Sequence, residues 1–369
     1  MIKLVHISDL HLDTPFAGCD LAERSARRSE LRDGLSAVCR YCKENLVQLL
    51  LIAGDLFESD YTSRETARFV AECLGTIPET RVFISPGNHD PYNGASPYRY
   101  CQFPDNVHIF SGESLESVEI PELHTAVYGY AFTGESMTEN PVHGIHPFDT
   151  DRINILVAHG DYDVPRSPYY SISHSDICES GLDYVALGHI HKPSGIMNAG
   201  GTVWAYSGCL IGRDFGECGE RGMIAGTISK ESGANLSYIP VTKASFEELR
   251  IDANDKSVDE AIEEARRLRS ELASECRVRI TLCGTDRARL DIIRQNLLSD
   301  ATMGFCEVLE EVSELAVFEE IADEFSMRGE FARRLRPYIE SEDESVRETA
   351  EMALHMFWNT RTIHSKTEC

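Results

Sequence analysis

The sequence opens with MIKLVHISDLHLD (residues 1–13), a short apolar run that ends abruptly in polar residues. Ile2 to Ile7 is rich in β-branched side chains and lacks helical periodicity, so it predicts a buried strand. Asp9 and His11 follow at once, where the strand should give way to a loop. A strand whose carboxyl end carries polar side chains is therefore the unit from which the fold is predicted.

The same pattern recurs at four further places before residue 192. The apolar runs are 49–53, 82–84, 153–158 and 184–187, and they lead into Gly54-Asp55, Gly87-Asn88-His89-Asp90, His159-Gly160 and Gly188-His189-Ile190-His191. Stretches of helical character over 23–46 and 63–75 separate the first three runs, which predicts β-α-β-α-β with a parallel sheet. Ligands gather outside the carboxyl ends of strands in such sheets, so we expect five polar clusters to converge on one site.

The remainder of the 369 residues predicts a smaller appendage to this α/β unit. An antiparallel hairpin over 223–241 is expected to close a first domain of residues 1–244. Residues 245–320 show a β-α-β-α-β pattern, which predicts a small α/β capping domain. Residues 321–369 predict two amphipathic C-terminal helices, separated near Pro337, that either pack at home or bind a partner.

Composition narrows the class of protein. Hydrophobic residues make up 42% and charged residues 26%, as in soluble globular proteins, and no apolar run approaches the roughly 18 residues of a membrane span. The first residues lack the pattern of a signal peptide, so we expect a cytoplasmic protein whose 12 scattered cysteines are free thiols. A net charge of −26 argues against a protein that binds nucleic acid through an overall positive charge. Bound divalent cations would nevertheless reverse the electrostatic field locally.

The polar clusters have the donor types of a two-metal hydrolytic site, which needs one bridging ligand and several terminal ones. Asp55 is the expected bridge, because a carboxylate offers one oxygen to each ion and Gly54 permits a close approach. The other expected ligands are oxygen or imidazole donors, namely Asp9, His11, Asn88, His159, His189 and His191. This mixture disfavours magnesium and favours manganese, iron or zinc.

Residues beside these ligands are assigned supporting roles. His89 is expected to stabilise the phosphoryl charge or to protonate the leaving oxygen. Asp90 and Asp161 are expected to orient the ligating imidazoles without binding metal themselves. Arg24, Arg27, Arg28 and Arg32 lie at nearly helical spacing, and the sequence leaves open whether they contact a phosphate backbone or pair with nearby carboxylates.

The motifs Asp9-x-His11, Gly54-Asp55, Gly87-Asn88-His89-Asp90, His159-Gly160 and Gly188-His189-x-His191 together resemble those of calcineurin-like metallophosphoesterases. Two further stretches, Gly54-Asp55-Leu56-Phe57 and Tyr206-Ser207-Gly208 with Gly212-Arg213-Asp214-Phe215-Gly216-Glu217, resemble the SbcD-type DNA repair exonuclease branch. The resemblance is close over residues 1–245 and looser beyond them.

This resemblance implies a four-layer αββα sandwich that carries two manganese ions. One ion would take Asp9, His11, Asp55 and His191, and the other Asp55, Asn88, His159 and His189, while His89 would act on the phosphate. Arg213 is expected to contact substrate because it lies in the branch-like loop. The implied partners are DNA and an SbcC-type coiled-coil ATPase, and a homodimer is a further assembly considered. Many relatives place His or Asp at the position of Glu58, which puts exonuclease action more in doubt than phosphodiester hydrolysis.

The sequence therefore leaves three functions open. The first is a manganese-dependent DNA nuclease, exonuclease or endonuclease, that acts in DNA repair. The second is a phosphodiesterase for a small nucleotide, which the acidic composition favours. The third is a scaffold that binds DNA or an ATPase without turnover, which the complete set of ligand residues disfavours.

Overall fold

The computed structural model describes residues 1–242, 245–312, 318 and 321–362. It divides into two compact units, Met1–Glu247 and Glu248–Cys369. The predicted boundaries at 244 and 320 fall on residues outside the described ranges, so the division into three domains stays a prediction. Among the described residues, none of the helices has the length and apolar character that crossing a membrane requires.

The first unit contains two six-stranded sheets. The first sheet has the order β14-β13-β1-β2-β3-β4, and the second has the order β11-β12-β10-β7-β6-β5. The strands of the first sheet are β1 (Ile2–Ile7), β2 (Leu49–Ile52), β3 (Arg81–Ile84), β4 (Val107–Ile109), β13 (Gly222–Ser229) and β14 (Gly233–Pro240). Those of the second are β5 (Glu116–Ile120), β6 (Thr125–Gly129), β7 (Ile153–His159), β10 (Tyr184–Gly188), β11 (Met197–Ala199) and β12 (Thr202–Tyr206).

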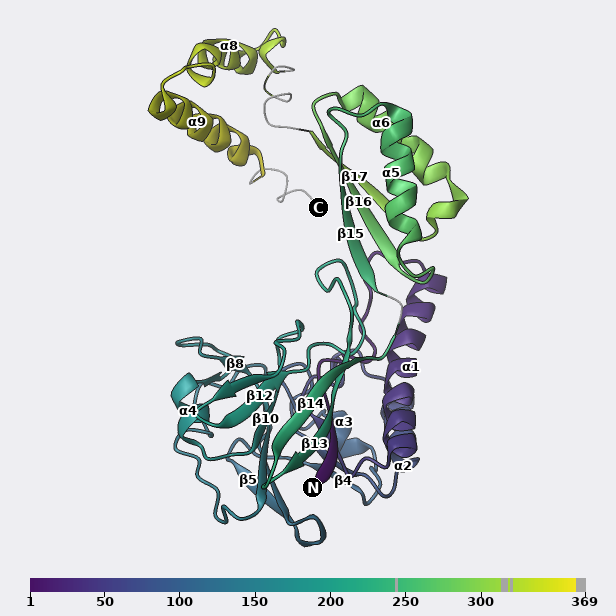
Figure 1. Ribbon diagram of the computed structural model, residues 1–369, viewed down its shortest axis with the longest axis vertical. Coiled ribbons are helices and arrows are strands. Elements are labelled where there is room, and N and C mark those ends of the chain that lie inside the picture. The colour runs from purple at the N-terminus through teal and green to yellow at the C-terminus, as the bar shows by residue number, and fades with distance from the viewer. Residues whose placement is uncertain (243–244, 313–317, 319–320, 363–369) are drawn as a thin grey trace. The chain divides into compact units, whose positions relative to one another are not determined.

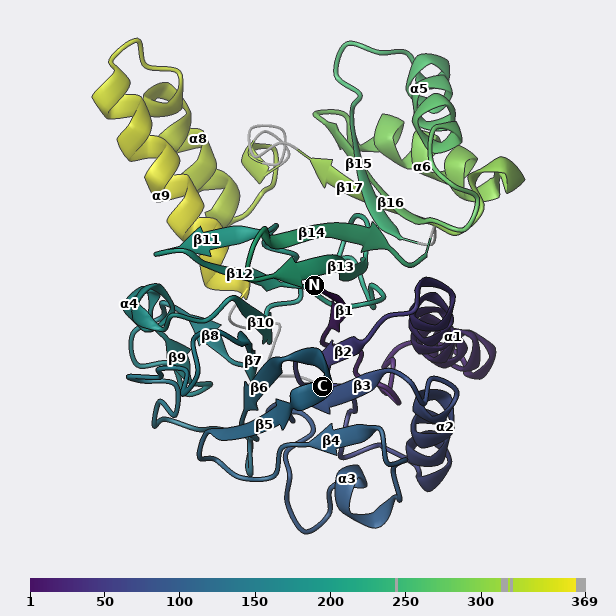
Figure 2. The ribbon, with the colours of Figure 1, turned by 60° about the horizontal axis from the view of Figure 1, so that its bottom comes forward.

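The predicted β-α-β-α-β unit is confirmed in the first sheet. Strand β1 pairs in parallel with β2, and β2 pairs in parallel with β3. Helices α1 (Leu21–Asn45) and α2 (Arg64–Gly75) connect them and lie beside this sheet (Figure 2). Asp20 and Ser63 cap the two helices by accepting a hydrogen bond from a backbone N–H in the first turn. The predicted hairpin is also present, as β13 and β14.

Three apolar clusters separate the layers of this unit. The central cluster lies between the sheets, with Leu4 and Leu51 from the first and Ile155 and Ala186 from the second. A second cluster packs α1 and α2 against the first sheet, and a third covers the outer face of the second sheet, where α4 (His174–Glu179) contributes. The layers therefore follow the αββα order of the expected sandwich, and strands buried on both faces explain the continuous apolar runs in the sequence.

His6 is the one histidine in the interior of β1, and it is fully buried between the sheets. Its Nδ1 lies 2.8 Å from the Tyr184 hydroxyl, and burial lowers its pKa to about 3. The unfolded chain, with a pKa near 6.5, therefore takes up a proton that the folded protein excludes as the pH falls from about 6.5 towards 3.

We expect this histidine to cost about 2 kcal/mol of folding stability between pH 7 and pH 5. Urea unfolding of a His6→Gln variant should show a correspondingly smaller loss over that pH range. His146→Gln, at an exposed position, is the matched control and should behave as the unchanged protein. An equal acid sensitivity in His6→Gln and the unchanged protein would contradict this assignment.

The second unit contains the sheet β15-β16-β17 with two helices on one face (Figure 1). Its elements are β15 (Phe246–Asp252), α5 (Val258–Ser270), β16 (Arg277–Gly284), α6 (Arg287–Ser299) and β17 (Cys306–Val312), the order predicted from the sequence. Two helices follow, α8 (Met327–Ile339) and α9 (Glu344–Thr362). Pro337 lies inside the end of α8, and the helix ends at Ile339. Ala350 and Leu354 are buried, so part of the apolar face of α9 packs within the unit.

Candidate metal centre

The predicted ligands lie in tight loops at the carboxyl ends of five strands. Four of them have a backbone φ in the left-handed region: 53° at Asp9, 46° at His11, 50° at Asp55 and 106° at His189. Non-glycine residues seldom adopt such angles, and clusters of them are characteristic of functional sites. The loops are held together by backbone hydrogen bonds, including Asp9 N–H to Gly54 O at 3.1 Å and His11 N–H to Asp55 O at 2.9 Å.

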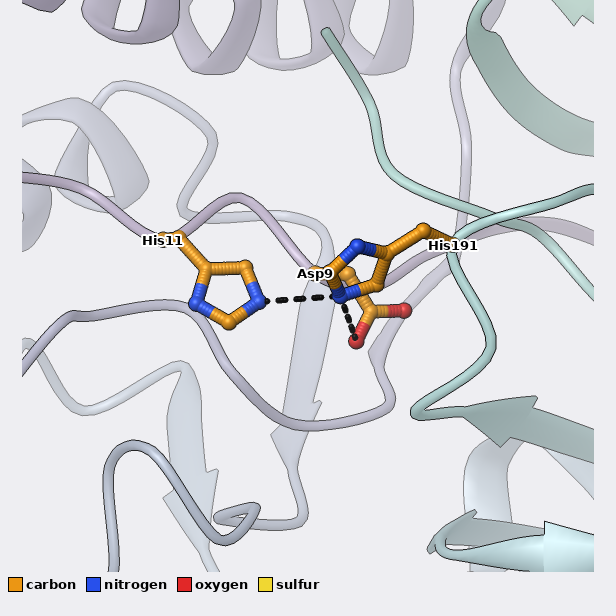
Figure 3. A group of neighbouring side chains, drawn as sticks. All are labelled: Asp9, His11 and His191. Carbon is orange, nitrogen blue, oxygen red and sulfur yellow. Dashed lines mark hydrogen bonds and ion pairs between the residues drawn. The ribbon is translucent and has the colours of Figure 1, made fainter. Parts of the chain in front are cut away.

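Asp9, His11 and His191 form a first group whose donor atoms face one another (Figure 3). The Nε2 atoms of His11 and His191 are 3.2 Å apart, and His191 Nε2 lies 3.9 Å from Asp9 Oδ1. Two nitrogens bound to one ion at about 2.1 Å would be separated by roughly 3.0–3.4 Å. The spacing of the two imidazoles therefore fits a shared cation.

The protons on these imidazoles point to the same conclusion. His11 Nδ1 donates to Glu58 Oε2 at 3.1 Å. His191 Nδ1 lies 2.7 Å from Glu217 Oε1, an acceptor, and 2.9 Å from Arg213 Nη2, a donor. Burial lowers the pKa of His11, which keeps this ring neutral with an unshared pair on Nε2. The unshared pair on His11 Nε2 faces His191 Nε2, where a cation could bind both rings. The donor set thus fits a divalent metal ion. At such centres the second nitrogen of a ligating imidazole commonly contacts a carboxylate, as it does here.

His159 is the centre of a second group, with Asp9 and Asp55. Its Nδ1 donates to the carbonyl oxygen of Ala53 at 2.9 Å, which leaves Nε2 as the ligating atom. That Nε2 lies 3.0 Å from Asn88 Oδ1 and 3.3 Å from Asp55 Oδ2. Burial opposes the charged form of His159, but Asp55 outweighs it and raises the pKa of His159 to about 9. The surroundings of this imidazole thus favour a positive charge.

Asp55, a member of the second group, also lies close to the first. Its Oδ2 is 3.6 Å from His11 Nε2 and 3.3 Å from His159 Nε2, and its Oδ1 accepts the His89 backbone N–H at 2.9 Å. Burial opposes ionisation, yet the neighbouring imidazoles, with His159 foremost, hold the pKa of Asp55 well below its usual range. This position between the two sets of imidazoles is the one that the bridging role requires.

His189, in the loop after β10, lies beside the second group but is not among the residues whose donor atoms gather there. Its ring lies 5.2 Å from that of His159, and its Nε2 is 3.5 Å from Asp161 Oδ1. Because Nε2 faces a carboxylate, Nδ1 is the nitrogen left for a metal ion. Asp161 thus lies next to this imidazole, and its orienting role stays a prediction.

Glycines at the site allow the strands to approach closely. A Cβ on Gly54, which has a φ of +84°, would collide with the His159 ring, and a Cβ on Gly188 would collide with the Ala53 carbonyl. Any side chain at either position would push apart the two sheets where their ligands meet.

The family comparison bears on the same residues. The family model for calcineurin-like phosphoesterases matches residues 2–193, which is more than half of the chain. The chain belongs to the calcineurin-like phosphoesterases. The match includes all eight predicted metal and catalytic residues and ends before Arg213 and Glu217.

A relative of this phosphoesterase is the uncharacterized metallophosphoesterase YhaO of Bacillus subtilis. The two are 29% identical over 233 residues, which is 60% of this chain and 56% of YhaO. The chain thus matches little more than half of that protein, and the comparison supports metal-dependent phosphoester hydrolysis without naming a substrate.

In this phosphoesterase Asp90 supports the backbone of a ligand loop rather than a ligating imidazole. Its carboxylate accepts the N–H groups of Asp55 at 3.1 Å, Leu56 at 2.7 Å and Gly87 at 2.7 Å, together with the Tyr98 hydroxyl at 2.5 Å. The sequence-based expectation that Asp90 orients an imidazole is thereby corrected, because backbone donors occupy both of its oxygens. Burial and the nearby Asp55 raise its pKa to about 6.

Replacing Asp90 by Asn should therefore destabilise the loop that holds Asp55. The amide retains one accepting oxygen and turns an NH₂ group towards backbone donors, which should cost about 1–3 kcal/mol in unfolding free energy. Affinity for Mn²⁺ should fall about 10–100-fold. Urea unfolding and isothermal titration calorimetry measure the two effects. Unchanged Mn²⁺ affinity would show that the loop keeps its shape without this carboxylate.

Glu217 and Arg213 form a further support beyond the family match. Arg213 Nη2 donates to Glu217 Oε1 at 2.7 Å, and the Arg213 backbone N–H donates to Glu217 Oε2 at 2.6 Å. Burial opposes ionisation of Glu217, but hydrogen bonds from His191 and Arg213 hold its pKa well below the usual range. The Arg213 guanidinium is thus engaged with the carboxylate that orients His191, and direct contact with substrate stays a prediction.

The α1 arginines have partners within the unit. Arg27 pairs with Glu30 and donates to Gly212 O at 2.8 Å, and Arg28 donates to Thr14 O at 3.2 Å. Arg32 donates to the Thr66 hydroxyl at 2.7 Å. Of the two readings left open by the sequence, these contacts favour a structural role for all three side chains.

Proposed function

We propose that this phosphoesterase is a metal-dependent DNA nuclease of the SbcD type that hydrolyses phosphodiester bonds in DNA repair. The observation that carries the proposal is the placement of the branch-like loop 206–217 around the metal centre. Ser207 Oγ lies 2.8 Å from Ser8 Oγ, which donates to Asp9 at 2.5 Å, and Glu217 orients His191. The residues that resemble the nuclease branch thus support the ligands themselves.

Exposure at the site is compatible with a polymeric substrate. Side-chain exposure is 46% at His89 and 31% at His191, whereas His159 and Asp9 are fully buried. The centre is therefore accessible from the side of His89 and His191, where an extended phosphate backbone can approach.

Metal ions and protein side chains would have separate roles in phosphodiester hydrolysis. Two divalent ions, proposed to be manganese, supply Lewis-acid catalysis when bound. Asp9, His11, Asp55 and His191 would hold one, and Asp55, Asn88, His159 and His189 the other. His89 stabilises charge on the phosphoryl group or protonates the leaving oxygen, and its backbone N–H holds Asp55 in place.

End-labelled DNA hairpins and bis-p-nitrophenyl phosphate, each with Mn²⁺, test this proposal. We expect cleavage of both by the unchanged chain. Hydrolysis of the small ester alone would favour the phosphodiesterase for a small nucleotide, a function that the net charge of −26 also suits. Failure to cleave either substrate would favour the non-catalytic scaffold.

We further propose α8 and α9 as the contact for an SbcC-type ATPase. Phe325, just before α8, Met327, its first residue, and Tyr338, near its end, are large side chains that are mostly exposed. Limited proteolysis of the chain with and without the ATPase tests this contact. Protection of α8 only in the complex would support it, and equal cleavage with and without the ATPase would contradict it.

A further inference from the structure

Two buried cysteines face each other where helices α1 and α2 pack together. Cys39, on α1, and Cys73, on α2, have their Sγ atoms 3.5 Å apart. Both belong to the apolar cluster that packs these helices against the first sheet. Cys39 is 3% exposed and Cys73 is 9% exposed, so the surrounding side chains hold the two thiols in contact. The fold thus places thiols from separate helices within reach of each other.

A disulfide between these cysteines requires only a small movement. Bonded sulfur atoms are about 2.05 Å apart, so the two Sγ atoms would have to approach each other by roughly 1.5 Å. Small rotations of both side chains about χ1 can supply this movement with little change in the backbone, because each rotation swings the sulfur about its own Cα–Cβ bond. The packing of α1 against α2 is therefore compatible with a covalent link.

The surroundings make Cys73 the more reactive of the two thiols. Its Sγ also lies 3.9 Å from the Ser36 hydroxyl oxygen. The hydrogen bond with Cys39 outweighs burial and, together with the Ser36 contact, lowers the pKa of Cys73 to about 7. The contact with Cys73 and burial raise the pKa of Cys39. Because the thiolate is the nucleophile in thiol oxidation, Cys73 is the residue that an oxidant attacks first.

We propose that Cys39 and Cys73 form a reversible disulfide between α1 and α2 when the protein is exposed to a peroxide. The Cys73 thiolate attacks one oxygen of hydrogen peroxide, so that a sulfur–oxygen bond forms, the oxygen–oxygen bond breaks, and the departing hydroxide takes up a proton to become water. Cys39 sulfur then attacks the sulfenic acid on Cys73, and the hydroxyl group leaves as water with the Cys39 proton. Two thiols are thereby oxidised to one disulfide, and one peroxide is reduced to two waters.

The disulfide would enclose the segment that contains the expected bridging ligand. Strand β2, Asp55 and the start of α2 all lie between Cys39 and Cys73 in the sequence. Ser63, the cap of α2, donates its backbone N–H to Asp13 Oδ2 at 2.9 Å and so connects this segment to the loop after β1. A cross-link restricts the enclosed segment in the unfolded chain. The oxidised protein should therefore resist unfolding better than the reduced protein.

Mass spectrometry after brief treatment with hydrogen peroxide tests the pairing, with Zn²⁺ as the metal ion so that metal-catalysed oxidation does not interfere. Remaining thiols are blocked with N-ethylmaleimide in denaturant before digestion. We expect the peptides of Cys39 and Cys73 to be joined with the loss of two hydrogens, and dithiothreitol should separate them. Cys42→Ser, one turn along α1, is the matched control and should form the same link. Recovery of both cysteines as maleimide adducts, or a link from either one to Cys42, would overturn the proposal.

Variants at each cysteine test the order of the steps. In Cys39→Ser the reaction should stop at the sulfenic acid, which dimedone traps on Cys73. Cys73→Ser should leave Cys39 unmodified under the same treatment, because the nucleophile is missing. Dimedone labelling of Cys39 in Cys73→Ser, at the rate seen for Cys73 in Cys39→Ser, would contradict the assignment of Cys73 as the attacking thiol.

Thermal unfolding measures the consequence for the fold. The oxidised protein should have a Tm roughly 5–10 °C above that of the reduced protein. Each variant is compared with its own reduced form, so any destabilisation by the substitution itself cancels, and the difference should persist in Cys42→Ser and vanish in Cys39→Ser and Cys73→Ser. Equal Tm values for the linked and reduced forms of the unchanged chain would contradict the stabilising role. None of these measurements needs turnover, so their outcome is independent of the proposed nuclease activity.

Discussion

Replacing Asp55 by Asn is expected to lower turnover roughly a thousand-fold or more and to reduce the binding of divalent metal from two ions to at most one. Asp55 Oδ2 lies within 3.6 Å of ligand nitrogens from both groups. An amide presents a single oxygen and directs an NH₂ group towards either a cation or the His89 N–H. Mn²⁺ stoichiometry by calorimetry and hydrolysis of bis-p-nitrophenyl phosphate measure the two effects.

Asp60→Asn, at an exposed aspartate of the same loop, is the control for this variant. It removes a formal charge close to the centre without removing a ligand, and it should bind two ions. If Asp55→Asn also bound two ions and retained most of its turnover, the bridging role would be excluded.

His89→Gln should retain both metal ions and lose about 10²–10⁴-fold in kcat. His89 Nδ1 is engaged with Glu58, its side chain is 46% exposed, and its ring lies at the edge of the ligand set. Glutamine can replace its hydrogen bond to Glu58 but cannot deliver a proton to the leaving oxygen. Single-turnover kinetics, together with the Mn²⁺ stoichiometry, distinguish this role from metal binding.

A different role for His89, as a metal ligand, would give a different result in the His89→Gln variant. His11, Glu58 and His89 also form a group close enough to hold a cation. If His89 were a ligand of such an ion, His89→Gln would lose metal in proportion to its activity. Loss of turnover with full metal content is therefore the result that assigns His89 to the substrate.

The sequence predicts much of the first unit because its central strands are buried on both faces. The runs that became β1, β2, β3, β7 and β10 are continuous and apolar, and each ends in a polar cluster. Strands β5 and β12 were not predicted. The first four residues of β5 (Glu116–Ile120) alternate between half-buried and exposed positions and only Ile120 is buried, so no apolar run marks the strand. Their pairing, of β5 with β6 and of β12 with β10 and β11, rather than their own composition, determines their conformation.

At the site, too, residues next to a predicted strand could be identified from the sequence, whereas contacts between separate loops could not. The predicted ligands could be found because each follows its strand directly. Glu217 was not given a role, since its contact with His191 joins residues from separate loops. The role of Asp90 was misassigned because accepting backbone N–H groups leaves no pattern in the sequence. Supporting residues of this kind are visible only once the chain has folded.

Both sheets contribute ligands to each proposed ion, and this has a thermodynamic consequence. Asp9 and His11 follow a strand of one sheet while His191 follows a strand of the other, and the same division separates Asn88 from His159. Opening the sandwich would release the ions, so free Mn²⁺ should suppress that opening in proportion to its concentration. Amide hydrogen exchange in β1 and β10 should accordingly slow as Mn²⁺ is added. Bound metal would then stabilise the fold as well as take part in hydrolysis.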